Sequence, residues 1–237
     1  MTPRETDPLL ALAALEGVPS AVASARDAVD AVLRDRGLRR ITADQLAWSL
    51  LDGARANAAL SEEPERLLPG AIRLSGELHE LAASILRSPG QAIARAHALV
   101  GYGLVPDDQL GRIRPAAAER MAGLQQLLNS SSEASGLVLA AIAHAEVATV
   151  APFGFGDGLV ARAVEQAVLI ARGFDPEGVV PVSSGHRELA EEYPARLAGY
   201  VEVTGVGPWI AYCARAVTQA AERLGGRLGR SAAPGAR

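Results

Sequence analysis

The sequence contains few aromatic residues, one cysteine and no lysine. Aromatic residues make up 4% of the 237 residues and apolar residues 49%, so alanine, leucine and valine must fill the core. Such small side chains suit closely packed helices better than a β-sandwich, and we therefore predict an all-α fold. The single cysteine, Cys213, excludes an internal disulfide and a zinc site made of several cysteines. We expect it to be a small, buried, apolar residue.

An excess of positive charge is also lacking. The net charge of -4 at pH 7 and the pI near 5.6 give no general attraction for nucleic acid, so we expect no nucleic-acid partner. The apolar run at residues 9–15 is too short for a secretory signal or a membrane span. These features predict a cytoplasmic protein without membrane contact, and they leave the oligomeric state open.

Signals for the start and the end of helices recur along the chain. Thr42 and Gln45 have the spacing of a capping box, and so do Ser130 and Glu133 ahead of an apolar run that ends near Val150. Gly173 follows the next apolar run and is expected to end that helix. The predicted helices cover residues 20–37, 42–60, 67–87, 91–100, 116–128, 130–150, 159–172, 194–203 and 208–224, with a break at 88–90.

A stretch rich in glycine, proline and aspartate covers residues 101–115 and is typical of a connection between structural units. We therefore predict three parts. They are an N-terminal helical region at residues 1–110, a helical core at 111–225 and a disordered tail at 226–237.

A glycine-rich motif, APFGFGDGLVAR at residues 151–162, joins two of the predicted helices. Its glycines allow a close turn, and the backbone N–H groups at the start of the second helix converge on one point, which favours an anion. We predict a compact loop with an anion at the N–H groups of residues 156–159 and Arg162 pointing back at the loop. The alternative is a tight turn that binds nothing. The predicted site residues are Gly154, Gly156, Asp157, Gly158 and Arg162, and the predicted loop anchors are Pro152 and Phe153.

This motif resembles the signature of the Fic (Fido) family, His-Pro-Phe-x-Asp/Glu-Gly-Asn-Gly-Arg-x-x-Arg, in the same register. The resemblance covers about residues 132–224. It implies a Fic-type helical bundle with the motif loop between two core helices, preceded by N-terminal helices. It also implies a relation to enzymes that transfer AMP from ATP, with Mg2+, to a hydroxyl group of a protein (AMPylation).

The chain departs from this signature at the positions that the resemblance assigns to chemistry. Ala151 stands where the family histidine takes a proton from the target hydroxyl, and alanine has no titratable group. Phe155 replaces the acidic residue that holds magnesium, and Leu159 replaces the first phosphate-binding arginine. Asp157 replaces the asparagine and is the residue that could recruit magnesium. Segments matching the family's β-hairpin flap and its inhibitory helix motif are also lacking.

The resulting hypothesis is a catalytically degenerate Fic-fold protein, a pseudoenzyme that binds a nucleotide, another anion or a protein partner. The residues assign no cofactor, and ATP or ADP with Mg2+ is the ligand that the resemblance implies. Two alternatives stay open. One is an active nucleotidyl- or phosphoryl-transferase in which Asp157 or a partner supplies the missing base. The other is a purely structural helical interaction module, such as an antitoxin-like partner.

The histidines show no metal-ligand spacing. His144 and Glu146 are two residues apart, so they lie on different faces of a helix and do not form a metal pair. We expect His144, His79 and His97 to be ordinary surface or core polar residues. His186 is expected at a helix entrance with local hydrogen bonds or at the rim of a cleft, and Trp209 is expected to anchor the core.

Overall fold

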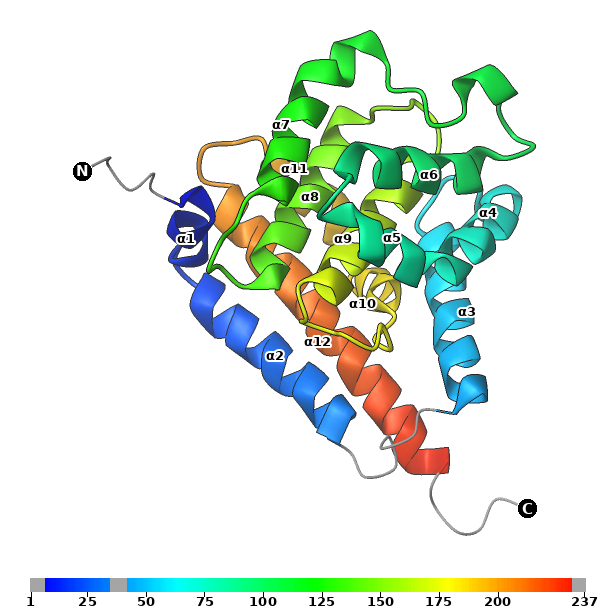
Figure 1. Cartoon of the computed structure of the whole chain (residues 1–237). Coiled ribbons are helices and arrows are strands. Elements are labelled where there is room, and N and C mark those ends of the chain that lie inside the picture. Colours follow the sequence, from blue (N-terminus) through cyan, green and yellow to red (C-terminus); the bar gives the residue numbers. More distant parts are fainter. Residues whose placement is uncertain (1–6, 35–41, 232–237) are drawn as a thin grey trace.

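The structure is a computed structural model that describes residues 7–34 and 42–231. Within these residues the regular secondary structure is entirely helical, which confirms the prediction of an all-α fold (Figure 1). None of the described helices combines the length and the hydropathy needed to cross a membrane. The α-helices are α1 (Pro8–Ala13), α2 (Val18–Arg34), α3 (Ala43–Ala59), α4 (Pro64–Gly76), α5 (Leu78–Ile85), α6 (Pro89–Gly101), α7 (Ala118–Asn129), α8 (Gly136–Val150), α9 (Asp157–Ala171), α10 (Val182–Glu188), α11 (Tyr193–Gly199) and α12 (Val206–Ser231).

Local capping explains where two of these helices begin. The predicted capping box of α3 is confirmed, because the Thr42 hydroxyl accepts from the Gln45 N–H while the Gln45 side chain accepts from the Thr42 N–H. The predicted cap of α8 at Ser130 is wrong. Ser130 is extended at the end of α7, and the hydroxyl of Ser135 instead accepts from the N–H of Leu137 at 3.3 Å. α8 therefore begins six residues later than the expected cap, at Gly136.

Other helix boundaries also differ from the expectation. The stretch 67–100 contains parts of three helices, because the chain breaks at Glu77 as well as at Ser88. The short helix α10 was not predicted. Residues 226–231, expected in a disordered tail, continue α12, since Leu228 packs on the core and the Arg227 guanidinium lies 3.8 Å from the centre of the Trp48 ring. The expected helix end at Gly37 and residues 232–237 lie outside the described residues.

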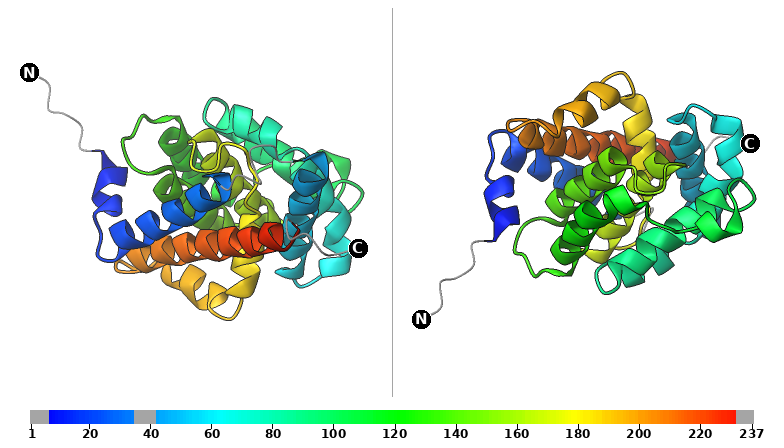
Figure 2. Two further views of the ribbon diagram at one scale, coloured as in Figure 1. Left: turned by 90° about the horizontal axis from the view of Figure 1, so that it is seen from below. Right: turned by 90° about the horizontal axis from the view of Figure 1, so that it is seen from above.

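The centre of the fold is the pair α8 and α9. Ten consecutive residues of α8, 136–145, are buried, as expected of a helix that is surrounded on all sides by others. Helices α5 and α6 pack on α9, and α12 packs on α8. The long helices α2 and α12 lie side by side along one flank (Figure 2). The motif loop therefore sits between two helices that the rest of the molecule holds in place.

The boundary expected near residue 110 falls in the connection between α6 and α7. Residues from both sides of it, such as Ile93 and Val160, belong to one hydrophobic core. The division of the chain into an N-terminal region and a core stays a prediction.

Candidate functional site

Residues 151–156 form the compact loop predicted between α8 and α9, but it is shorter than the expected 151–158, because α9 begins at Asp157 and not at Leu159. Ala151 is left-handed, with φ 46°, and so is Gly156, with φ 66°. A Cβ atom at Gly156 would lie 2.6 Å from Cγ1 of Val100, so the loop approaches α6 too closely for any side chain there. Arg114 closes the other side, because its N–H donates to the Pro152 oxygen at 2.8 Å and its guanidinium donates to the Ala151 oxygen.

The two expected anchors hold the loop differently. Pro152 is buried, whereas Phe153 is half-buried and stacks on the imidazole of His97, with the ring centres 4.0 Å apart and the planes 4° from parallel. His97 is itself fixed, since its Nδ1 accepts from the N–H of Gly111 at 2.9 Å. This stack connects the motif loop to α6 and to the connection that follows α6.

Asp157 lines the cleft next to the motif and also bonds back into the loop. Its side chain is 8% exposed, and Oδ1 accepts from the N–H of Phe153 at 2.8 Å. Burial raises the pKa of Asp157, while the N–H groups of Phe153 and Gly154 act in the opposite direction. The carboxylate therefore takes up N–H groups that the loop could otherwise offer to an external anion.

Arg162, in the second turn of α9, is engaged inside the protein. It is 2% exposed, and its Nε donates to Oδ1 of Asn57 at 2.6 Å. Its Nη2 donates to the Asn57 carbonyl at 3.1 Å, and its Nη1 to the hydroxyl of Tyr193 at 3.3 Å. The guanidinium also lies against Gly158, where a Cβ atom would be 3.4 Å from Nη1. Asn57 and Tyr193 thus use most of the donors of Arg162.

A cleft of about 360 Å³ opens between the motif and the connection from α3 to α4. Gly154, Gly156, Gly158 and Arg162 all line it, so the structure brings the expected site residues together. Phe155 also lines the cleft, with the Arg66 guanidinium 5.5 Å from the centre of its ring.

The charge of this cleft is unfavourable for a polyphosphate. Its lining includes three carboxylates, those of Glu62, Glu63 and Asp157, against the single guanidinium of Arg162. Leu159, at the position of the first phosphate-binding arginine of the signature, is 1% exposed and adds no charge. Arg66 pairs with Glu63 at 2.7 Å and offsets one of these carboxylates, so without metal the lining gives a polyphosphate little net attraction.

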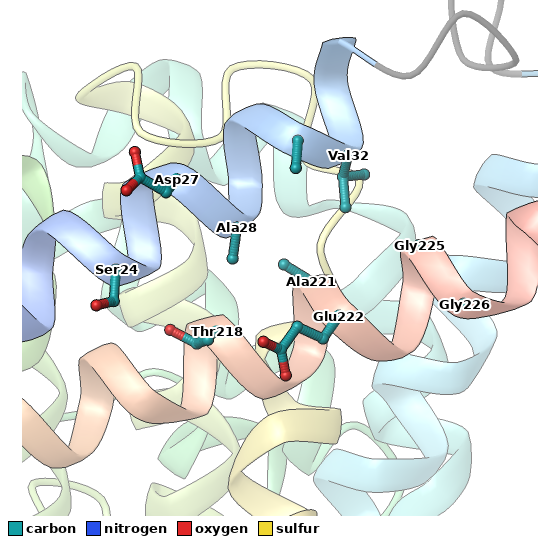
Figure 3. Close-up of a pocket in the computed structure, with 10 residues that line it drawn as sticks. Ser24, Asp27, Ala28, Val32, Thr218, Ala221, Glu222, Gly225 and Gly226 are labelled. Atoms are coloured by element: carbon teal, nitrogen blue, oxygen red, sulfur yellow. The ribbon is translucent and has the colours of Figure 1, made fainter.

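A larger hollow of about 620 Å³ lies between α2 and α12, away from the motif (Figure 3). Small side chains such as Ala28 and Ala221 line it, together with Asp27 and Glu222. These residues offer no set of groups typical of catalysis or of phosphate binding.

Below the cleft, the core contains a polar cluster that the sequence analysis did not find. Oε2 of Glu165 lies 2.7 Å from Nδ1 of His144 and 2.7 Å from Nε2 of His186. The second nitrogen of His144 lies 2.8 Å from the Tyr193 hydroxyl, and that of His186 lies 3.2 Å from the Tyr212 hydroxyl. Because Tyr193 also accepts from Arg162, hydrogen bonds run from the cleft into the core.

The protonation states in this cluster follow from its burial. Burial lowers the pKa of His144 to about 4, so this imidazole is neutral at pH 7. Burial alone would raise the pKa of Glu165, but His186 and His144 outweigh it and hold that pKa at about 2. Burial raises the pKa of the Cys213 thiol well above its usual range. Glu165 is therefore the anion of the cluster, and each histidine donates one N–H to it.

No sequence pattern indicates that the residues of this buried cluster lie together. His186 lies in the last turn of α10 and is completely buried, so it is neither at a helix entrance nor at a cleft rim. Its hydrogen-bond partners, Glu165 and Tyr212, are distant in sequence and not local. Trp209 and Cys213 are buried, as expected. Glu146 contacts Arg120 and not His144, in agreement with the argument from helix faces. A signal for Glu165 was present, because it is a lone acid within the apolar run AVEQAVLIA of α9.

The sequence of this chain matches no family model and no curated protein. In structure it is similar to a Fic family protein from Desulfovibrio desulfuricans G20, with a TM-score of 0.71 and 18% identity, over 90% of this chain and 75% of that one. It is also similar to Fic-1 from C. elegans, with a TM-score of 0.65 and 19% identity, over 90% of this chain and 73% of that one. The chain therefore has the Fic fold.

Proposed function

We propose that this chain is a catalytically degenerate Fic-fold protein that acts by binding and does not transfer nucleotides. The observation that carries the proposal is the hydrogen bond by which Oδ1 of Asp157 accepts from the N–H of Phe153 at 2.8 Å, within the motif loop. Ala151, at the position of the family histidine, cannot take a proton, and Asp157 is the nearest acid in the motif that could replace it. Since Asp157 is bonded within the loop, it is poorly placed to meet a substrate hydroxyl.

The same geometry favours a protein partner over a free nucleotide as the ligand. The N–H of Phe153 serves Asp157, and the guanidinium of Arg162 serves Asn57 and Tyr193. A nucleotide phosphate would have to displace these internal contacts in a cleft that is rich in carboxylates. Each broken contact of a buried charged group costs about 1.5–3 kcal/mol.

A second candidate function, a transferase that uses Asp157 as its base, is favoured by one observation. Burial raises the pKa of Asp157, as is common for carboxylates that act as general bases. Its hydrogen bond to Phe153 opposes this role, and direct measurement decides between the two.

The decisive experiment is incubation with labelled ATP and Mg2+, followed by detection of modified protein, including the chain itself. We expect transfer near background for the natural chain. Ala151→His alone should restore little, because the metal ligand and the phosphate clamp act on the same transition state. The quadruple variant Ala151→His, Phe155→Asp, Asp157→Asn and Leu159→Arg should transfer measurable AMP onto itself, provided that circular dichroism shows it folded.

The result that contradicts the proposal is robust transfer by the natural chain that Asp157→Ala abolishes. Asp157 would then be the base of an active enzyme. This measurement on the natural chain is decisive even if the quadruple variant does not fold.

Ligand binding is tested separately by thermal unfolding with and without ATP or ADP and Mg2+. We expect no shift for the natural chain and a stabilisation in Asp157→Asn, which keeps the shape of the side chain and removes its charge. A ligand at about 100 times its dissociation constant adds about 2.7 kcal/mol, which is readily detected. Asp27→Asn, an exposed change on α2, is the control. Equal stabilisation of the natural chain and Asp157→Asn would show that the internal carboxylate does not block the site.

A further inference from the structure

Four side chains of metal-binding types converge in the core from four different helices. They are His144 of α8, Glu165 of α9, His186 of α10 and Cys213 of α12, and each is at most 1% exposed. The ligand atoms of His144, Glu165 and Cys213 all lie within 4.8 Å of one another. Nε2 of His186 lies 2.7 Å from the same Glu165 oxygen. We propose that these four residues bind one divalent transition-metal ion, zinc or an ion of similar chemistry.

The donor set has the composition that such ions prefer. Two imidazole nitrogens, one carboxylate oxygen and one thiolate sulfur are ligands of zinc, which is held by four ligands in structural sites. The ion would also neutralise the cluster, because Glu165 and the Cys213 thiolate together carry two negative charges. A buried carboxylate is held either by paired groups, as Glu165 is by His144 and His186, or by a metal ion.

The tyrosines fit the role of groups that orient the ligands. In each histidine, the ring nitrogen that would not bind the metal faces a tyrosine hydroxyl. The partner of His144 is Tyr193, and the partner of His186 is Tyr212. Hydrogen bonds of this kind fix the ring orientation and the tautomer of metal-binding histidines. The helices that carry His186 and Cys213 are held close together. A Cβ atom at Gly185 would lie 1.8 Å from the carbonyl oxygen of Ala216, where α10 crosses α12.

Metal binding requires a defined rearrangement of protons and a movement of the ligand side chains. On each histidine the proton moves to the nitrogen facing the tyrosine, and that tyrosine becomes the acceptor. Cys213 loses its proton to solvent, so one proton is released for each ion bound. The separations of 2.7 Å from Glu165 to the two histidine nitrogens are those of hydrogen bonds. The edge of a tetrahedral zinc site is about 3.3 Å, so these two pairs of atoms must separate by roughly half an ångström. His186 is not among the residues whose ligand atoms all lie within 4.8 Å of one another, so its ring must also move toward the other ligands.

Because the cluster is closed to solvent, the ion has to enter while the chain folds. The test therefore unfolds the full chain, freed of any affinity tag, in denaturant with a chelator. After removal of the chelator, the chain is refolded with and without equimolar Co2+. We expect one bound cobalt per chain, a thiolate-to-cobalt charge-transfer band and a melting temperature above that of the metal-free chain. Cys213 is the only cysteine in the sequence, so this band identifies the site.

Two variants make the test specific. Cys213→Ser should abolish the charge-transfer band and weaken cobalt binding by at least about tenfold, since a hydroxyl is a poor ligand for this ion. His79→Gln, an exposed change, is the matched control and should keep both the band and the stoichiometry. If Cys213→Ser does not fold, the measurements on the natural chain are decisive.

The result that overturns the proposal is substoichiometric cobalt with no charge-transfer band and the same melting temperature with and without metal. The cluster would then be held together by hydrogen bonds alone. None of the four ligands lines the motif cleft, so this outcome is independent of the nucleotide tests.

Discussion

The contact between Asn57 and Arg162 should contribute strongly to stability, and Asn57→Ala tests this. Asn57 lies on α3 and is 5% exposed. Its Oδ1 accepts from Nε of Arg162 at 2.6 Å, and its Nδ2 donates to the carbonyl of Leu159 at 3.3 Å. Both contacts join α3 to the first turns of α9. Alanine removes both and leaves a buried guanidinium nitrogen without this partner.

The expected loss follows from the type of each contact. A hydrogen bond to a charged group contributes about 1.5–3 kcal/mol, and a neutral one about 1 kcal/mol. The hydrogen bond from Arg162 to the backbone carbonyl of residue 57 is retained, because alanine also provides that oxygen. We therefore expect Asn57→Ala to lower the free energy of unfolding by about 3 kcal/mol, which for a chain of this size is a fall in melting temperature of roughly 6–12 °C.

Urea unfolding at pH 7 measures this loss, with Asn129→Ala as the matched control. Asn129 is the other asparagine of the chain and is exposed at the end of α7, so its removal should change stability by less than about 0.5 kcal/mol. Phosphate should recover part of the loss in Asn57→Ala, because the released guanidinium can then bind it. A loss below about 1 kcal/mol, or one equal to that of the control, would refute the reasoning.

Two further predictions concern the core. Burial raises the pKa of Asp175 to about 6, so the folded state favours the protonated acid, and the free energy of unfolding should fall as the pH rises from about 4 through about 6. Asp175→Asn should reduce this fall by up to about 3 kcal/mol, measured by urea unfolding at several pH values. The same pH profile of stability for the natural chain and the variant would contradict the prediction. Gly185→Ala should destabilise by at least about 3 kcal/mol, because the new Cβ would lie 1.8 Å from the Ala216 oxygen. Gly199→Ala, with nothing within 4 Å of its Cβ, should be neutral or stabilising in the same assay, and similar effects of both changes would argue against the close crossing.

Features encoded within a few residues were predictable from the sequence. The capping box of Thr42 and Gln45 depends on neighbouring residues, and so does the tight loop made by the motif glycines. The short helix α10, by contrast, contains serines and a glycine that are weak helix formers. Its packing against α12 supports it, and that contact joins segments far apart in the chain.

The difference between local and long-range contacts also explains which parts of the candidate site could be predicted from the sequence. Residues of the motif are neighbours in sequence, so their convergence on one cleft could be anticipated. His144 and His186 are each 21 residues from Glu165, and no helical period specifies that their rings meet the same oxygen. Asn57 lies 105 residues from Arg162, so the hydrogen bond between them could not be predicted from the sequence either. Tertiary packing decides these contacts, and a single sequence does not show which helix faces which.

Tyr193 links the motif cleft to the buried cluster, and this link bears on our proposal that the cleft does not bind a free nucleotide. Its hydroxyl accepts from Arg162 and donates to His144, which in turn donates to Glu165. The positive charge of Arg162 and the negative charge of Glu165 are thus connected through two neutral side chains within a medium of low dielectric constant. An arginine whose charge is balanced from inside attracts an external phosphate less than a free one does. The glycine loop and the second arginine of the signature are both present, yet each already serves a group of the protein itself.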